Sequence, residues 1–131
     1  MRFETQLDTL VFAILIVGFM PMICAVIAKW GAQGYDNHNP RAWMANQEGF
    51  RARANAAQQN CFEAFPFFAV GVMLASLGGA DGDLLESVGW FFVAMRVAYI
   101  ACYVTDKATL RSVFWALGYA AVIYLYVLAL Y

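Results

Sequence analysis

Residues 10 to 28 read LVFAILIVGFMPMICAVIA and carry no charge. A run of this length matches the hydrocarbon core of a bilayer, which a helix crosses with about 20 apolar residues. Glu4 and Asp8 precede the run together with a single arginine, and this acidic start is unlike the positively charged start of a cleaved signal peptide. We therefore interpret the run as a transmembrane helix and keep a cleaved leader as the alternative.

Three more apolar stretches follow, and together they account for the whole chain. Of the 131 residues, 63% are hydrophobic and 13% are charged, which is too apolar for a soluble domain of this size. The predicted helices cover about 5–29, 41–77, 83–105 and 108–130. Because the later connections are short, consecutive helices should be antiparallel. The sequence thus predicts an all-α membrane protein, with residues 1–131 forming one integral membrane domain, a four-transmembrane-helix up-and-down bundle.

The connection before the second helix is long and polar, with glycine, asparagine and proline, which are turn residues. Pro40 suits the first turn of a helix, and Asn39 suits the capping position before it. This helix should therefore begin in water and enter the bilayer further along. Pro21 and Pro66 fall inside predicted spans, where each proline frees a carbonyl group and bends the helix.

The lysines and arginines indicate the orientation, because cytoplasmic loops near the membrane are enriched in them. Six of them lie in or beside the first and third connections: Lys29, Arg41, Arg51, Arg53, Lys107 and Arg111. The second connection and the residues after it are acidic, with Asp81, Asp83 and Glu86 and no positive charge. We expect both termini to lie outside the cytoplasm.

A polar stripe descends the second predicted helix. Arg53, Asn60, Glu63 and Phe67 fall on one face, because residues three, four and seven apart share a helix face. A glutamate at membrane depth is unfavourable by a few kcal/mol unless it is paired or hydrated. Two readings remain open at this point. Glu63 pairs with an arginine of another helix and locks the bundle, or the same pair lines a cavity for a polar ligand.

The third helix supplies the expected partner of Glu63. Arg96, Tyr99 and Tyr103 share a face by their spacing of three and seven. Arg96 needs an acid inside the membrane, and Glu63 is the carboxylate available to it. A buried arginine–glutamate pair is compatible with a purely structural role. The two tyrosine hydroxyl groups suit a ligand site, although tyrosines near helix ends are also common as membrane-interface anchors.

Arg111 begins the fourth helix, at the end where other arginines gather. Arg111 either anchors the helix on the cytoplasmic side, or it makes this end of the bundle cationic enough to attract a carboxylate-bearing small molecule.

The three cysteines fit neither a disulfide framework nor a zinc spacing, and they should pack as small hydrophobic residues. His38 has no second ligand beside it, so we predict no metal site, and the absence of a basic patch argues against a nucleic-acid partner.

Two motifs together resemble the MAPEG family, the membrane-associated proteins in eicosanoid and glutathione metabolism. The first is AAQQNCFEAFPFF, residues 56–68, and the second is MRVAYIACYVTDKATLR, residues 95–111. The resemblance covers nearly the whole chain, and the protein is similar to small bacterial-type members. It implies a homotrimer that holds glutathione, as co-substrate, between neighbouring subunits near the cytoplasmic side.

The resemblance also implies roles for individual residues. Those that would bind glutathione are Gln58, Asn60, Glu63, Arg96, Tyr99 and Tyr103. Arg111 and Tyr103 would be the catalytic residues, with Arg111 stabilising the glutathione thiolate. The chain departs from the family pattern at Ala56, where an arginine is expected and which Arg53 would replace, and at Ala64, where a tyrosine is often found.

The implied function is that of a glutathione S-transferase or peroxidase in the bacterial inner membrane, acting on lipophilic small molecules that arrive through the lipid bilayer. Two alternatives belong to other classes. A small proton-coupled multidrug transporter would use Glu63 to exchange protons for drugs, and a non-catalytic membrane scaffold would use the polar stripe only to fix its assembly.

Overall fold

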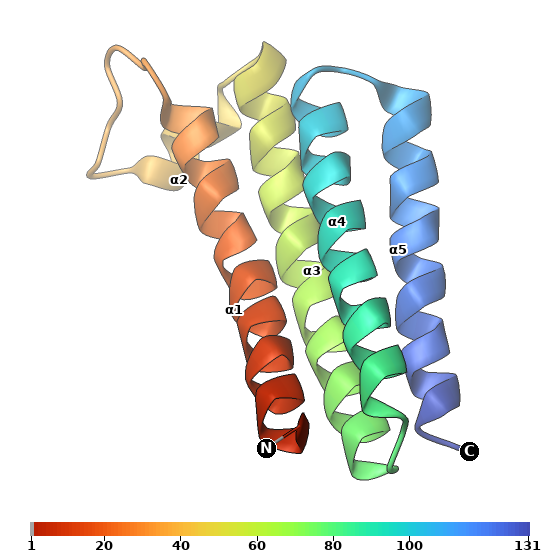
Figure 1. The fold of residues 1–131 in the computed structure, drawn as a ribbon. Helices are drawn as coiled ribbons and strands as arrows, with labels where there is room; N and C mark the ends of the chain where they lie inside the picture. Colours follow the sequence, from red (N-terminus) through yellow and green to blue (C-terminus); the bar gives the residue numbers. More distant parts are fainter. Residues whose placement is uncertain (1) are drawn as a thin grey trace.

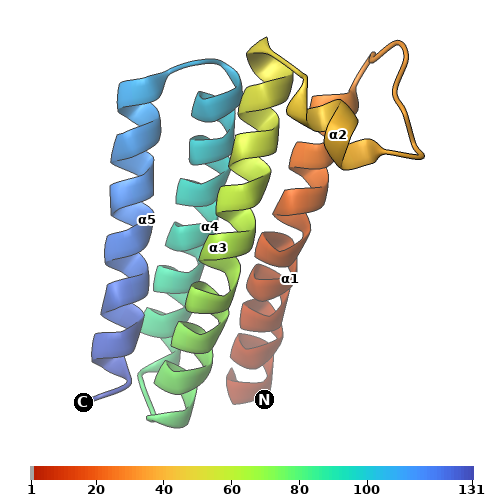
Figure 2. The same cartoon turned by 180° about the vertical axis from the view of Figure 1, so that it is seen from behind.

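A computed structural model describes the backbone of residues 2–131 and the side chains from Gln6 onward. The helices are α1 (Arg2–Lys29), α2 (Pro40–Ala45), α3 (Gly49–Leu77), α4 (Gly82–Val104) and α5 (Ala108–Leu128). Within this described part, all except α2 are long and apolar enough to cross a membrane. The four long helices alternate in direction, and both termini lie at the same end of the bundle (Figure 1). Seen from either side, α3 and α4 lie between α1 and α5 (Figure 1, Figure 2). This arrangement is the predicted up-and-down bundle.

The second predicted helix is divided. The expectation of one continuous helix over 41–77 is corrected by the short helix α2, which ends at Ala45, and by α3, which begins at Gly49. Gly49 has a φ of 61°, a left-handed conformation that glycine adopts at little cost and that interrupts a right-handed helix. Pro40 occupies the first turn of α2 as expected, but the side chain of Asn39 makes no capping hydrogen bond.

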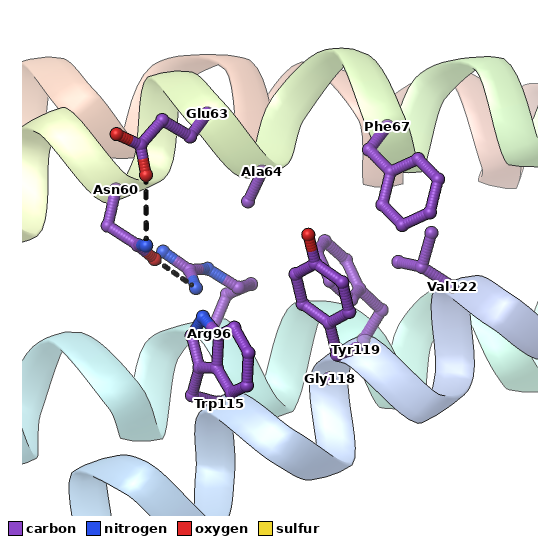
Figure 3. A pocket seen from close by; sticks show the side chains of 10 residues that line it. Asn60, Glu63, Ala64, Phe67, Arg96, Trp115, Gly118, Tyr119 and Val122 are labelled. Atoms are coloured by element: carbon purple, nitrogen blue, oxygen red, sulfur yellow. Dashed lines mark hydrogen bonds between the residues drawn. The ribbon is translucent and has the colours of Figure 1, made fainter.

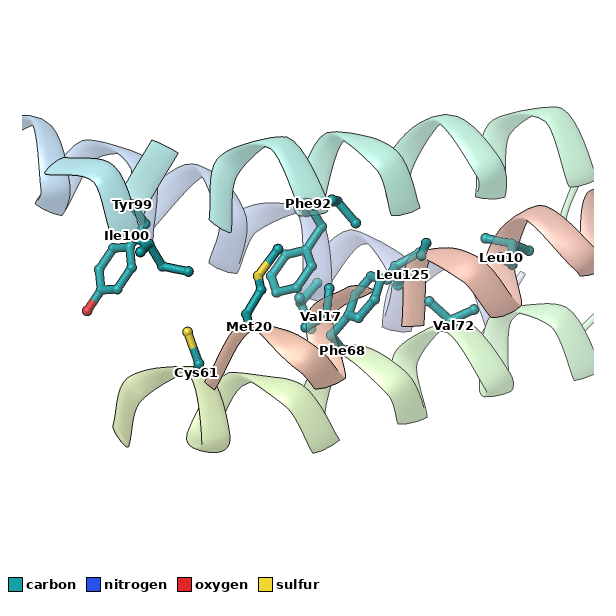
Figure 4. Packing of buried hydrophobic residues seen from close by; sticks show 14 of the residues in the cluster. Leu10, Val17, Met20, Cys61, Phe68, Val72, Phe92, Tyr99, Ile100 and Leu125 are labelled. Carbon is teal, nitrogen blue, oxygen red and sulfur yellow. The ribbon is translucent and has the colours of Figure 1, made fainter. Parts of the chain in front are cut away.

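Aromatic and aliphatic side chains from all four long helices form the core. Phe68 of α3 stacks on Phe92 of α4 with ring centroids 4.2 Å apart, and Met20 and Leu125 close the cluster from α1 and α5 (Figure 4). Burying each such side chain is worth about 1.5–3 kcal/mol where it leaves water. In a membrane, close packing supplies much of the stabilisation instead. The core therefore fixes α3 against α4, which is where the polar stripe lies.

Helices α3 and α5 approach closely at Gly71. A Cβ atom at this position would lie 3.1 Å from the Tyr126 ring and 3.3 Å from the Leu125 Cβ. Four residues earlier on α3, the Phe67 carbonyl accepts a 3.1 Å hydrogen bond from the Tyr126 hydroxyl. Small residues that let helix backbones approach are typical of membrane bundles. This contact positions the face of α5 that borders the site.

The outer surface of α1 is apolar. Phe12, Phe19, Met22, Ile23 and Val26 are all more than half exposed in the single chain. Exposed apolar side chains in such a continuous row are unfavourable in water and favourable against lipid. The outward face of α1 thus agrees with a helix that contacts hydrocarbon or another subunit.

Candidate functional site

Arg96 is a buried charge in the middle of the bundle, with only 3% of its surface exposed. Its Nη1 donates a hydrogen bond to Asn60 Oδ1 at 2.9 Å, and its Nη2 donates to Cys61 Sγ at 3.2 Å. The Nε atom is fully buried and has no partner among the described residues. Buried polar groups are nearly always satisfied, so the orphaned Nε identifies this guanidinium as incompletely partnered within one chain.

The predicted direct ion pair between Glu63 and Arg96 is wrong. Asn60 lies between them: its Nδ2 donates to Glu63 Oε2 at 3.4 Å, while its oxygen accepts from Arg96 (Figure 3). Residues three apart on a helix differ by about 60° in direction. Asn60 therefore faces α4, and Glu63 turns outward and is exposed in the single chain. As a result, no carboxylate contacts the buried guanidinium in the part of the chain that the structure describes.

Two arginine–tyrosine pairs continue from Arg96 toward the α2 end of the bundle. The Arg96 guanidinium lies 4.2 Å from the Tyr99 ring centroid, and the Arg111 guanidinium lies 4.4 Å from that of Tyr103. The two tyrosine rings meet edge to face with centroids 5.6 Å apart. Such cation–π contacts are worth about 0.5–2 kcal/mol each. They hold both guanidinium groups along one column of aromatic rings.

Two adjoining cavities border this column. A cavity of about 90 Å³ lies between α3, α4 and α5 (Figure 3). It is lined by Asn60, Glu63, Ala64, Phe67, Phe92, Arg96, Trp115, Gly118, Tyr119 and Val122. A second cavity, of about 230 Å³, is lined by Tyr99, Tyr103, Arg111, Ser112 and Trp115. Trp115 lines both, so the two hollows adjoin at this side chain, one beside Arg111 and the other reaching Val122.

Two of the predicted site residues point elsewhere. The Nε and Nη2 atoms of Arg53 both donate to the Val104 carbonyl, at 3.2 and 3.1 Å, and so cap the end of α4. Gln58 lines a hollow of about 500 Å³ on the opposite face of α3, together with Lys29 and Arg41. The structure therefore brings Asn60, Glu63, Arg96, Tyr99, Tyr103 and Arg111 to one side and separates Gln58 from them.

A comparison with known protein families matches this architecture. Residues 9–131 fit the MAPEG family, so the match includes both motifs, most of α1 and all of the other long helices. The chain belongs to the MAPEG family. A MAPEG protein is a glutathione-related integral membrane protein, and the four apolar helices of this one are its transmembrane helices. A search of curated proteins found no match.

Sequence reasoning missed part of the site of this MAPEG protein. Trp115 lines both cavities, and Gly118 and Val122 line the smaller one. These residues follow Arg111 by four, seven and eleven positions, the spacing of a single helix face. That spacing could have predicted the α5 wall. Cys61 was treated as a packing residue, and nothing in the sequence indicated that it accepts a hydrogen bond from Arg96.

Proposed function

We propose that this MAPEG protein binds glutathione and acts as a glutathione S-transferase or glutathione peroxidase on lipophilic electrophiles. The observation that carries the proposal is the buried Arg96 guanidinium, which lines a cavity and lacks both a carboxylate and a partner for Nε within the described chain. A buried cation is strongly unfavourable unless an anion compensates it. A carboxylate of glutathione fits this need, because carboxylates bind guanidinium groups through charge-assisted hydrogen bonds.

The other groups on this side of the bundle suit the remaining charges of the tripeptide. Glu63 lies at the mouth of the cavity and can accept a hydrogen bond from the glutathione ammonium group. Asn60 joins Glu63 to Arg96 and so holds the acceptor and the donor at a fixed separation. Tyr99 and Tyr103 offer hydroxyl groups beside them. The chain thus provides recognition groups of both signs at one place.

Glutathione supplies a thiol, which conjugates with an electrophilic carbon or reduces a hydroperoxide. A free thiol of this kind has a pKa of about 8.5, and the thiolate is the nucleophile. Arg111 would favour the thiolate by its positive charge, with each pKa unit worth about 1.4 kcal/mol, and the Tyr103 hydroxyl would donate a hydrogen bond to the sulfur. The Arg111 guanidinium lies over the Tyr103 ring, and both side chains line the same hollow.

The apolar side chains of the smaller cavity suit the second reactant. Phe67, Phe92 and Val122 line the smaller cavity beyond Arg96, and Trp115 and Tyr119 of α5, which also line it, are exposed in the single chain. A lipophilic electrophile would therefore reach the thiolate from the bilayer without crossing the cationic mouth.

A homotrimer would complete the site. Gln58, Lys29 and Arg41 surround a hollow on the face of α3 that points away from Asn60. If a neighbouring copy places this face against the Asn60 and Glu63 side, amide and cationic groups close the open wall of the groove. The separation of Gln58 from the other binding residues is then a consequence of assembly and not a contradiction. Crosslinking in membranes, read as dimers and trimers on a gel, tests this arrangement.

We place the glutathione site on the cytoplasmic side of a bacterial inner membrane, with both termini outside the cytoplasm. The basic residues of the two connections lie at the α2 end, and Asp81, Asp83 and Glu86 lie at the end that carries the termini. The positive-inside tendency favours this orientation. Cysteine-free variants with single cysteines introduced in each connection, labelled by an impermeant maleimide in intact cells, test it.

The deciding experiment is a thermal-shift titration of the purified protein in detergent with glutathione and with S-hexyl glutathione. We expect both to raise the melting temperature and Arg96→Met to abolish the shift, while Lys107→Gln, which removes an exposed charge at the same end, retains it. Conjugation of a lipophilic aryl halide should then depend on glutathione. No shift with either ligand would remove the basis of the enzyme proposal.

The two alternative functions predict other results. A proton-coupled transporter would lose drug export in Glu63→Gln and show no thiol conjugation, and a scaffold would show neither activity.

A further inference from the structure

The wall that α5 contributes to the smaller cavity carries two hydrogen-bond donors that the chemistry proposed above does not use. Trp115 and Tyr119 line this cavity together with Arg96, Asn60 and Glu63. The rings of Trp115 and Tyr119 stack with centroids 4.6 Å apart. Figure 3 shows the indole nitrogen of Trp115 on the side of Arg96, and the Tyr119 hydroxyl directed toward α3. Helix α5 thus presents an indole N–H and a phenol to the polar site.

Neither donor has a hydrogen-bond partner in the part of the chain that the structure describes. Tyr119 lies midway along α5, at a depth where the hydrocarbon core supplies no water to a hydroxyl group, whereas tyrosine anchors gather at the membrane interfaces. An indole nitrogen only donates, and the Nε atom of Arg96 is a third donor without a partner among the described residues. Three donors at one cavity therefore require an acceptor from a ligand.

The size of the cavity limits which part of a ligand can enter it. The volume is about 90 Å³, which is room for a few water-sized groups and too little for a whole tripeptide. A carboxylate fits, and its oxygens can accept from all three donors while its charge compensates that of Arg96. Figure 3 shows Val122 at the far end of the cavity from Arg96, so a carboxylate beside Arg96 leaves the apolar end uncovered.

The position of Glu63 indicates which carboxylate of glutathione this would be. Asn60 accepts from Arg96 at 2.9 Å and donates to Glu63 at 3.4 Å, so a single amide group spans the distance between the cation and the carboxylate. Glutathione has two carboxylates, and only the γ-glutamyl one is attached to the same carbon as the ammonium group. A ligand that places its ammonium on Glu63 and a carboxylate on Arg96 therefore presents its γ-glutamyl end.

We propose that the cavity between α3, α4 and α5 binds the γ-glutamyl end of glutathione, and that Trp115 and Tyr119 donate hydrogen bonds to its carboxylate. Arg96 donates to the same carboxylate from Nε, and Glu63 binds the ammonium group. The cavity thus recognises an α-amino acid, and the thiol and the glycine lie outside it. The choice of glutathione rests on the proposed function, whereas the recognition of a γ-glutamyl group can be tested without a thiol.

Two glutathione analogues and one conservative variant test these contacts. An amide replaces the γ-glutamyl carboxylate in one analogue and the glycine carboxylate in the other, and Tyr119→Phe keeps the ring but removes the hydroxyl. In isothermal titration, glutathione and the glycine amide should bind Tyr119→Phe about fivefold more weakly than the unmodified protein, as for one lost hydrogen bond. The γ-glutamyl amide should bind the unmodified protein about tenfold or more weakly than glutathione, with a further loss in Tyr119→Phe below about twofold. Equal losses with all three ligands, or none with glutathione, would overturn the proposal.

Tyr126→Phe is the matched control. The Tyr126 hydroxyl donates to the Phe67 carbonyl, and Tyr126 does not line the cavity, so its loss should lower the melting temperature and leave the relative affinities for the two amides unchanged. Trp115→Phe removes the indole donor and should depend on the γ-glutamyl carboxylate in the same way as Tyr119→Phe. If Tyr126→Phe reproduced the result of Tyr119→Phe, the effect would come from the packing of α5, and the proposal would fail.

A thiol-free ligand separates this proposal from the proposed function. γ-Glutamyl ethylamide carries the same amino-acid end without thiol or glycine. At millimolar concentrations it should raise the melting temperature of the unmodified protein, raise that of Tyr119→Phe less, and leave that of Arg96→Met unchanged. This result without any glutathione conjugation would keep the γ-glutamyl site and remove the enzymatic role. Stabilisation by glutathione alone would keep glutathione binding and overturn the γ-glutamyl site, and stabilisation by neither ligand would overturn both.

Discussion

Arg96 donates a hydrogen bond to Asn60 at 2.9 Å, and Asn60 in turn donates to Glu63 at 3.4 Å. The amide therefore separates the cation from the carboxylate, and the two charges do not neutralise each other by direct contact. If Glu63 had closed on Arg96, the polar stripe would be a lock between two helices. Because it does not, Arg96 can bind an anionic group and Glu63 can bind a cationic group. A zwitterionic ligand carries both.

Arg96→Met separates a binding role from a structural one. Replacing Arg96 removes a buried charge and with it the cost of desolvating that charge, although Asn60 and Cys61 each lose the hydrogen bond that Arg96 donates. We expect the melting temperature without ligand to stay near that of the unmodified protein and the stabilisation by glutathione to disappear. A variant that glutathione still stabilises fully would show that the ligand binds elsewhere.

Asn60→Asp changes the same contact in the opposite way. The new carboxylate would accept from Arg96 and neutralise it, while it repels Glu63. We expect a protein at least as stable as the original, whose glutathione affinity falls about tenfold or more, or about 1.4 kcal/mol. Isothermal titration with glutathione measures the affinity. Gln59→Glu adds the same charge one residue earlier, outside the Arg96 cavity, and should not reproduce the loss. Equal losses in the two variants would point to net charge and not to Arg96.

Arg53→Ala tests whether an arginine that caps a helix also binds the ligand. Its guanidinium makes two hydrogen bonds to the Val104 carbonyl, and hydrogen bonds to charged groups contribute about 1.5–3 kcal/mol. We expect a lower melting temperature and a loss of glutathione affinity that is smaller than in Arg96→Met. Arg51→Ala is the matched control, since Arg51 donates to the Ala28 carbonyl at the end of α1. A loss of affinity as large as that in Arg96→Met would make Arg53 a primary ligand.

Hydrophobic runs made the four spans predictable, and helical periodicity made Arg96, Tyr99 and Tyr103 predictable as neighbours. The same periodicity already places Gln58, about 200° from Asn60 around the helix, on the other face of α3. The role of Asn60 was not predictable, because it depends on the rotation of α3 about its axis relative to α4. A small rotation decides whether residue 60 or residue 63 meets the guanidinium. The break before Gly49 likewise depends on a local left-handed backbone that glycine permits but does not require.

Arg111→Lys addresses the chemical step. Both side chains carry a positive charge, but the planar guanidinium stacks on the Tyr103 ring at 4.4 Å, and a lysine ammonium is a compact group on a flexible stem that does not reproduce this stacking. We expect glutathione to bind with an affinity within about threefold of the original, a difference of roughly 0.7 kcal/mol. The rate of conjugation should fall about tenfold or more, because the thiolate loses a fixed positive charge.

The same variant also predicts a pH dependence that a purely structural role would not produce. If Arg111 holds the bound sulfur as thiolate, its replacement raises the pKa of the glutathione thiol toward the value of about 8.5 for a free thiol. The conjugation rate of Arg111→Lys should then rise with pH over a range in which the original protein is already at its plateau, and at high pH the two rates should converge. Lys107→Gln, which changes a different cation at this end of the bundle, serves as the control and should keep the original profile. Parallel pH profiles for Arg111→Lys and the original protein, separated by a constant factor, would assign Arg111 to positioning and not to thiolate stabilisation.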